Sequence, residues 1–340
     1  MVGATLSWTS RVLCAASWAA MAFGGAPVLP AEANEREVIL FEINQLNHMI
    51  VPIELNGQAA AEGVIDTAAT YPMIDRRTAL AAGIPEPGDN APQISVVGTL
   101  GVKEYSVVDI GAVKVGNVVL GSTRAAYNPT MKVEGAASNV LPLNLLGRDV
   151  VDFDFRNRKV FLYEGRPERI GGTASVTMKY VEENGLIFIP VRVNREKAFA
   201  LLDTGSNVTY INPRLAEAAR AKTNPEKTKI LQGATGGYGA LLEITTVRRC
   251  AIGGYEFKRA DVLVSDPPLF ELLGLAEEPA MVVGMDFLSE FRMQIDQSRK
   301  EITFTIPYRN MKGLGLKYAS DRSDNLGIIL GGSATRLKQN

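Results

Sequence analysis

The stretch "FALLDTGSNVTYINP", residues 199–213, places an acidic side chain directly after an apolar run. Asp203 ends that run and precedes Thr204, Gly205 and Ser206. An apolar run of this length is typical of a buried strand, and a carboxylate at its end is costly unless it is hydrogen-bonded or shared with a second group. The stretch therefore predicts a strand that delivers an acid into a partly buried loop.

The chain repeats this pattern once. "HMIVPIELNGQAAAEGVIDTAATYPMIDRRTALAAG" from position 48 parallels "LIFIPVRVNREKAFALLDTGSNVTYINPRLAEAARA" from position 186, with strands, an Asp-Thr pair and an Ala-rich helical segment in the same order. Each half later carries two apolar residues followed by glycine. The spacing from Asp66 to Gly147 is 81 positions, as is the spacing from Asp203 to Gly284. This equal spacing indicates an internal duplication.

The duplication predicts the domain organisation. We expect lobe one at residues 36–164 and lobe two at 174–308, joined by a linker at 165–173 that is rich in Gly, Pro and charge. Residues 309–340 are polar and Gly-rich, so we expect them to be partly ordered at most. Short strands, many Gly and Asn turns and a few short helices predict an all-β fold of two duplicated lobes.

The first 33 residues are typical of a cleavable signal peptide. Arg11 precedes an apolar stretch from Val12 to about Phe23, and small residues follow as far as Ala33. An uncleaved membrane anchor is the alternative, but Gly and Pro residues interrupt the apolar segment. We expect cleavage after Ala33 or Ala26, a periplasmic or secreted protein, and no stable membrane association after cleavage.

Charge and composition exclude several kinds of site. Lysine and arginine total 36 against 37 acidic residues, without long runs, so no footprint for nucleic acid is present. The single histidine, His48, leaves little for a histidine-based triad or a metal site, and we interpret it as a surface residue at a strand end. Cys250 would be alone after signal cleavage, as an inert strand thiol. We therefore predict no metal and no cofactor.

Two carboxylates supply a different chemistry. Two related lobes packed about a pseudo-two-fold axis would bring Asp66 and Asp203 together, as an isologous contact does in a dimer. Like-charged carboxylates in one site do not both ionise easily, so one holds a proton while the other acts as a base. Such a pair can activate water against a peptide carbonyl without metal or histidine.

These residues resemble the aspartic proteases of the pepsin and retroviral-protease type, over nearly the whole predicted mature chain. In that family each lobe carries an Asp-Thr/Ser-Gly loop supported by two apolar residues and a glycine, and a β-hairpin flap can follow. Lobe two matches fully at residues 203–206 and 282–284, and lobe one matches with "DTAAT" at 66–70 and with residues 145–147. The resemblance implies a bilobal acid-protease fold of two fused retropepsin-like lobes. We expect a monomer, with lobe pairing between chains left open.

The resemblance also implies roles for individual residues. Asp66 and Asp203 would be catalytic, and Ser206 would donate to the outer oxygen of Asp203. Because lobe one has Ala69 at the equivalent place, we expect Asp66 to be the more readily protonated carboxyl. The residues that would support the pair are Thr67, Thr204, Gly205 and Ser206, with the two threonines cross-linking the loops. The flap candidates are Gly98, Thr99 and Gly101 in lobe one and Gly233, Thr235, Gly236 and Tyr238 in lobe two.

The main departure from the family pattern is Ala68, where the family has glycine. An added methyl group can strain the loop or separate the carboxylates, and a misplacement of about 1 Å can cost on the order of a hundredfold in rate. Three functions stay open: an exported endopeptidase that cleaves extended peptides, a degenerate module that binds peptides without cleaving them, and a structural protein with the same fold. We favour the endopeptidase because both aspartates are retained.

Overall fold

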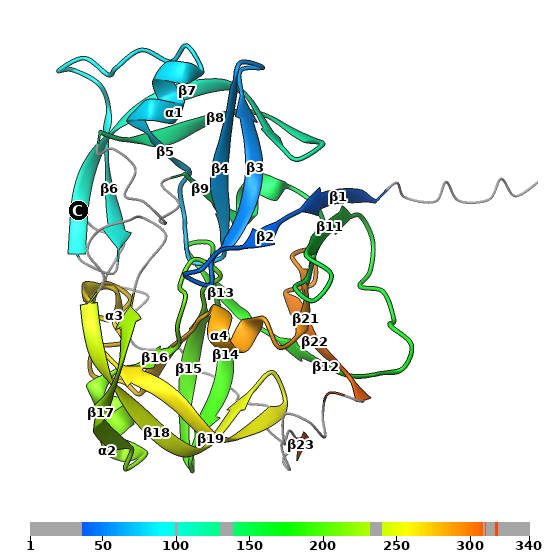
Figure 1. Ribbon diagram of the computed structural model, residues 1–340, viewed down its shortest axis with the longest axis vertical. Helices are drawn as coiled ribbons and strands as arrows, with labels where there is room; N and C mark the ends of the chain where they lie inside the picture. The colour runs from blue at the N-terminus through cyan, green and yellow to red at the C-terminus, as the bar shows by residue number, and fades with distance from the viewer. Residues whose placement is uncertain are drawn as a thin grey trace, which may run out of the picture. The chain divides into compact units, whose positions relative to one another are not determined.

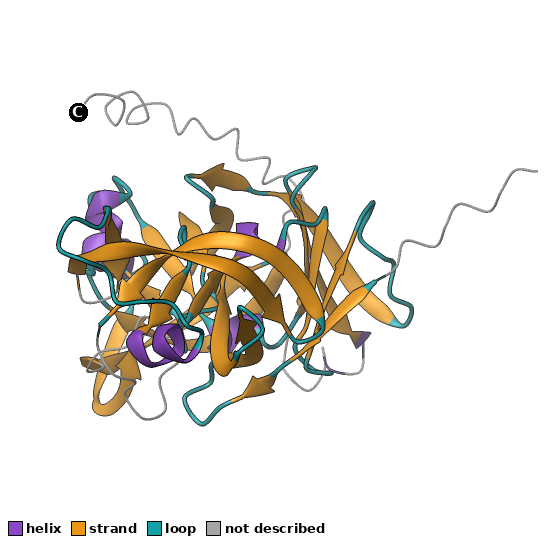
Figure 2. Ribbon diagram, turned by 90° about the horizontal axis from the view of Figure 1, so that it is seen from above, coloured by secondary structure: helices purple, strands orange, loops and turns teal. Residues whose placement is uncertain are grey.

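Three β-sheets make up the part of the chain that the computed structural model describes, which is residues 36–98, 101–129, 139–231, 240–308, 310 and 317–318. These residues belong to one compact unit. Strands dominate it and the helices are short (Figures 1 and 2). The predicted all-β fold is therefore confirmed. The predicted signal peptide and most of the predicted tail lie outside the described residues.

The first sheet is built from lobe one. Its strand β3 shows the alternating burial of a half-buried strand, and β4 runs parallel to β9, so that Asp66 lies opposite Pro142. Asp75 caps the following helix by accepting from the Thr78 N–H at 2.7 Å. In spatial order the strands are β2 (Glu42–Ile43), β3 (Met49–Leu55), β4 (Ala59–Asp66), β9 (Val140–Pro142), β5 (Met73–Asp75), β8 (Val118–Asn128), β7 (Gly101–Val115) and β6 (Gln93–Gly98). The helical elements are α1 (Arg76–Ala81) and the 3-10 helix η1 (Leu143–Leu146).

The second sheet repeats this arrangement in lobe two. Parallel pairing of β15 with β20 is the counterpart of β4 with β9, as the duplication predicts. The strands follow the order β13 (Val181–Glu183), β14 (Leu186–Val193), β15 (Glu196–Leu202), β20 (Ala280–Val283), β16 (Tyr210–Ile211), β19 (Tyr255–Val264), β18 (Ala240–Ile252) and β17 (Lys222–Leu231), and β23 (Lys317–Tyr318) pairs with β19. The helices are α2 (Pro213–Ala218), α3 (Pro268–Leu272) and α4 (Met285–Leu288).

A third sheet, which the sequence analysis did not predict, takes strands from both lobes. Its order is β1 (Glu37–Leu40), β11 (Lys159–Tyr163), β10 (Val150–Asp154), β21 (Arg292–Asp296), β22 (Glu301–Pro307) and β12 (Thr173–Lys179). The antiparallel pair β10–β21 joins the lobes. One face of this pair is apolar, with Val151, Phe153, Met293 and Ile295 fully buried in the largest core cluster. The two lobes are thus connected by a continuous backbone ladder and a common core.

The prediction that His48 is a surface residue is wrong. His48 is 0% exposed, and it precedes Met49 and Val51 of β3, which are also fully buried. The neighbouring Asn47 donates from Nδ2 to the carbonyl of Asn207 at 3.3 Å. This end of β3 is therefore in contact with lobe two. None of the helices in the described residues is long and apolar enough to span a membrane.

Candidate active site

Two apolar strands deliver the two aspartates to the lobe boundary. Strand β4 ends at Asp66, and β15 ends at Leu202, one residue before Asp203. The N–H of Asp203 donates to the carbonyl of Val283 at 3.0 Å, which ties the loop to the neighbouring strand β20. The same local sequence pattern has therefore produced the same structure in both lobes.

The carboxyl groups of Asp66 and Asp203 share a hydrogen bond across the lobe boundary. Each also accepts a backbone N–H from its own loop: Ala68 donates to Asp66 Oδ1 at 2.8 Å, and Gly205 donates to Asp203 Oδ1 at 2.9 Å. Asp66 is only 8% exposed. The structure thus brings together the two predicted catalytic residues in a nearly symmetric environment.

Thr67 and Thr204 cross-link the two loops. The Thr67 hydroxyl donates to the carbonyl of Leu202 at 2.6 Å and accepts the N–H of Thr204 at 3.1 Å. The Thr204 hydroxyl donates to the carbonyl of Ile65 at 2.7 Å and accepts the N–H of Thr67 at 3.1 Å. Both threonines are fully buried. This reciprocal set of four hydrogen bonds fixes the separation of the two aspartates.

Burial raises the pKa of both carboxyl groups. The pKa of Asp66 rises to about 6, with desolvation as the largest cause. Desolvation also raises the pKa of Asp203, and the adjacent Asp66 charge raises it further, well above the usual range. The predicted donation from Ser206 to Asp203 is wrong, because the Ser206 hydroxyl donates to the carbonyl of Val208 at 2.9 Å. This donation was the reason for expecting Asp66 to protonate more readily than Asp203, and the order of protonation within the pair stays a prediction.

The raised pKa of Asp66 predicts a stability cost at neutral pH. Below about pH 4 the carboxyl is protonated in both the folded and the unfolded chain, so it costs nothing. Between about pH 4 and 6 the unfolded chain ionises first, and stability falls by about 3 kcal/mol. Asp66→Asn removes this cost and keeps an acceptor for Ala68. We expect the variant to be more stable than wild type at pH 7 and not at pH 4, as measured by denaturant unfolding. Equal differences at both pH values would contradict the expectation.

Neighbouring atoms approach the backbone at Gly205 and Gly284 so closely that neither position has room for a side chain. A Cβ at Gly205 would lie 2.2 Å from Asp66 Oδ2, and one at Gly284 would lie 2.4 Å from the carbonyl oxygen of Val208. The N–H of Met285, next to Gly284, donates to the carbonyl of Ser206 at 2.9 Å. The apolar-apolar-Gly segment of lobe two thus supports its acidic loop directly.

Ala68 is accommodated by apolar packing. It is partly buried and packs against a cluster of lobe two that contains Val208, Tyr210 and Phe270. The next residue, Ala69, packs instead against a lobe-one cluster that contains Val64 and Met73. The two alanines that replace the family's glycine and its neighbour therefore fill apolar surroundings on opposite sides of the boundary.

The predicted flaps are only partly described. Gly98 and Gly101 form the last cross-strand pair of the β6–β7 hairpin, whereas Thr99 lies outside the described residues. Gly233, Thr235, Gly236 and Tyr238 also lie outside them, between β17 and β18. Each hairpin carries an exposed apolar pair near its tip, Val97 with Val102 and Ile230 with Leu241. The two hairpins therefore present similar apolar surfaces.

A polar network behind the lobe-two loop was not predicted. The Thr209 hydroxyl donates to Asp286 Oδ1 at 2.7 Å and accepts the N–H of Gly284 at 2.9 Å. Lys229, on the β17 strand of the hairpin, donates to Asp286 Oδ2 at 3.3 Å. Lobe one has Pro72 at the position of Thr209, and this difference in the sequence could have indicated that the network belongs to lobe two alone.

The described residues contain no group of His, Cys, Asp and Glu side chains that could hold a metal ion. Cys250 is fully buried, and burial raises the pKa of its thiol to about 12. A family model described as aspartyl protease matches residues 51–150 and 189–287, which together exceed half of the chain. The two matches include both aspartates, one in each lobe. No curated protein matches the chain.

Proposed function

This chain belongs to the aspartyl protease family, and we propose on that basis that it is an exported endopeptidase that hydrolyses peptide bonds with water activated by Asp66 and Asp203. The observation that carries the proposal is the contact between one carboxyl group from each lobe. The reciprocal threonine bonds support it, because they hold the carboxyls in place without substrate.

The proposed reaction needs one proton on the pair. The ionised carboxyl takes a proton from water as the water oxygen attacks the peptide carbonyl carbon, and the protonated carboxyl donates to the carbonyl oxygen. Collapse of the tetrahedral intermediate then breaks the C–N bond, with a proton passing to the leaving amine. The two carboxyls exchange roles, and neither is consumed. Their shared hydrogen bond supports such an exchange.

Extended peptides with apolar side chains are the proposed substrates. Ala68 and Ala69 lie two and three positions after Asp66, and each belongs to the partly buried edge of a different apolar cluster. Ile94 and Tyr105 are partly buried against the lobe-one cluster, as Ala69 is, and Leu242 is partly buried against the lobe-two cluster, as Ala68 is. Apolar surface on both sides of the two carboxyl groups favours apolar side chains on both sides of the cleaved bond.

The direct test is to incubate the purified protein with an unfolded protein mixture over pH 3 to 8 and to identify new peptide termini by mass spectrometry. We expect termini from wild type and none from Asp203→Asn. If the folded wild type releases no peptides at any pH, the endopeptidase proposal fails.

Ala68 motivates a second candidate, a peptide-binding module without turnover. The methyl group in the acidic loop is the observation that favours it, since the family has glycine there. Calorimetric binding of an extended apolar peptide that stays intact over the whole pH range would select this candidate. Under it, Ala68→Gly should create activity that wild type lacks.

The pKa values predict activity near neutral pH. Since the pKa of Asp66 is raised to about 6 and that of Asp203 is raised well above its usual range, the pair holds one proton above about pH 6 and two protons below it. The doubly protonated pair has no base, so kcat/KM should fall by about tenfold per pH unit below pH 6. We expect activity at pH 7 to exceed activity at pH 4 by about a hundredfold. Circular dichroism at each pH would show whether the chain stays folded, and a maximum near pH 4 would contradict the prediction.

Export is proposed from the first 33 residues alone. N-terminal sequencing of the protein recovered from the periplasm or the medium should begin at residue 34 or 27. Recovery of the intact chain from the membrane fraction would contradict cleavage.

A further inference from the structure

The two strands that join the lobes are equivalent in the duplication. In lobe one the Asn157 N–H donates to Asp154 Oδ1 at 3.1 Å, and in lobe two the Arg299 N–H donates to Asp296 Oδ1 at 2.9 Å. Each turn then has a residue with positive φ four positions after the aspartate, Arg158 at 56° and Lys300 at 53°. Asp154 therefore corresponds to Asp296. By the same register, β10 (150–154) corresponds to β21 (292–296), and we call this strand pair the seam.

The seam is symmetric about one residue pair. Asp152 lies opposite Gln294, and Gln294 is also the residue of lobe two that is equivalent to Asp152. Asp154 lies opposite Arg292, which is the lobe-two equivalent of Val150. An antiparallel ladder with this symmetry is isologous, so two copies of β10 from different molecules could form the same backbone hydrogen bonds. The backbone therefore does not distinguish lobe two from a second lobe one, and side chains must do so.

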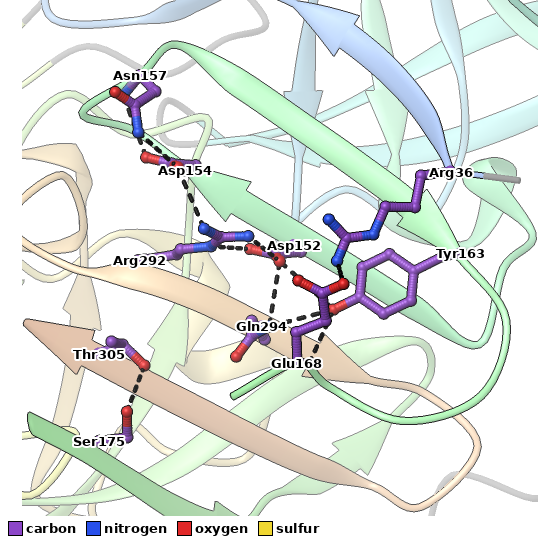
Figure 3. Close-up of polar contacts among 10 residues, drawn as sticks. All are labelled: Arg36, Asp152, Asp154, Asn157, Tyr163, Glu168, Ser175, Arg292, Gln294 and Thr305. Carbon is purple, nitrogen blue, oxygen red and sulfur yellow. Dashed lines mark hydrogen bonds and ion pairs between the residues drawn. The ribbon is translucent and has the colours of Figure 1, made fainter. Parts of the chain in front are cut away.

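Buried side chains on one face of the seam supply the distinction (Figure 3). Arg292 donates from Nε to Asp152 Oδ1 at 2.8 Å and from Nη2 to Asp152 Oδ2 at 2.7 Å, and its Nη1 lies 3.3 Å from Asp154 Oδ2. Gln294 donates from Nε2 to Asp152 Oδ2 and to the Tyr163 hydroxyl, each at 3.1 Å. Asp152 and Gln294 are 0% exposed. The two acids of lobe one thus receive their positive charge from lobe two.

A seam between two lobe-one strands would have no such compensation. Asp152 would face a second Asp152, and Asp154 would face Val150 in place of Arg292. Arg36, the other cation drawn on this face, is paired with Glu168 and lies over the ring of Tyr163 at 5.0 Å from its centroid. Two buried acids without a cation carry a large desolvation penalty.

We propose that Asp152, Arg292 and Gln294 form a recognition surface that makes lobe one accept lobe two and reject the lobe one of a second copy. The partner that this surface fits is a strand with arginine and glutamine at the positions of Arg292 and Gln294. The proposed activity needs this selectivity, because the unlike loops that carry Asp66 and Asp203 meet only when unlike lobes pair. The surface acts on assembly, so its test does not depend on whether the protein cleaves peptides.

A graft of lobe-one residues into lobe two tests the rejection in the full chain. Arg292→Val with Gln294→Asp gives both strands the lobe-one side chains at the seam. We expect a Tm lower than that of wild type by about 10 °C or more at pH 7, and a larger hydrodynamic radius without a rise in mass. Met293→Val is the matched control, because it also installs a lobe-one residue on β21 but changes no charge, and we expect a much smaller shift. A graft that is as stable and compact as wild type would overturn the proposal.

A second variant replaces the Asp152–Arg292 ion pair with apolar residues. It tests the selectivity without leaving the Asp152 charge uncompensated. Asp152→Leu with Arg292→Leu removes the buried pair together, a change that other proteins tolerate. We expect a folded protein that light scattering shows as a concentration-dependent mixture of monomer and dimer, because like lobes are no longer rejected. Arg214→Leu with Glu277→Leu, an exposed ion pair elsewhere in lobe two, is the control and should stay monomeric. An Asp152→Leu/Arg292→Leu variant that is folded and monomeric up to about 1 mM, the order of the effective concentration that a linker gives the lobe of the same chain, would overturn the proposal.

Discussion

Asp203→Asn is expected to lower kcat by about 10⁴-fold or more while leaving KM within about tenfold of wild type. Asparagine keeps an acceptor for the Gly205 N–H, which donates to Asp203 Oδ1 at 2.9 Å, so the loop geometry is preserved. It neither accepts the proton of the attacking water nor returns one to the carbonyl oxygen. The lost interactions belong to the transition state, which is why kcat falls and KM does not.

A measurement of thermal stability distinguishes a loss of catalysis in Asp203→Asn from a loss of the fold. Burial raises the pKa of Asp203, so at neutral pH the unfolded chain gains free energy by ionising this carboxyl and the folded chain does not, whereas the amide of asparagine carries no such cost. Asp203→Asn should therefore unfold at the same temperature as wild type or a higher one. Asp261→Asn, an exposed aspartate on β19 of the same lobe, is the matched control and should retain wild-type kcat. An Asp203→Asn variant that keeps more than about 1% of wild-type kcat would contradict the catalytic role of this residue.

The sequence predicted the elements whose determinants are local. Each aspartate follows an apolar strand and precedes a threonine, and duplication at equal spacing identified both, so their convergence followed from symmetry. The partner of the Ser206 hydroxyl was predicted incorrectly. A serine hydroxyl has several acceptors within two residues, and the structure selects the carbonyl of Val208. Composition and periodicity do not determine that choice.

The shared sheet was beyond sequence reasoning for a different reason. Its central pair joins Asp152 to Gln294, which are 142 positions apart, and all five residues of β10 are buried. A strand that is buried on both faces shows no alternation that would identify its neighbours. The buried His48 was also missed, and its neighbour Asn47 contacts lobe two through the carbonyl of Asn207. The pairing of the two lobes was therefore missed for a different reason from the local choice made by Ser206.

Gly205→Ala is expected to lower kcat by about a hundredfold or more and to destabilise the protein by about 1–3 kcal/mol. The new Cβ would lie 2.2 Å from Asp66 Oδ2 and 2.4 Å from its Cγ, well inside van der Waals contact. Asp66 has little room to retreat, because the Ala68 N–H holds its Oδ1 and the threonine bonds fix the loop. The methyl group must therefore push the two carboxyl groups out of the arrangement that shares one proton.

The equivalent position in lobe one gives this prediction its control. Ala68 already carries the methyl group that Gly205→Ala would add, yet it packs against the apolar cluster of lobe two. Ala68→Gly removes only that packing and adds backbone freedom, which costs about 1 kcal/mol. Its effect on kcat should be at least about tenfold smaller than that of Gly205→Ala, where a displacement of about 1 Å is forced on the pair. A rise in kcat for Ala68→Gly, in place of a small loss, would mean that both loops require glycine. In that case the methyl group of Ala68 would already impair the wild-type site, and the peptide-binding module would become the better account of the protein.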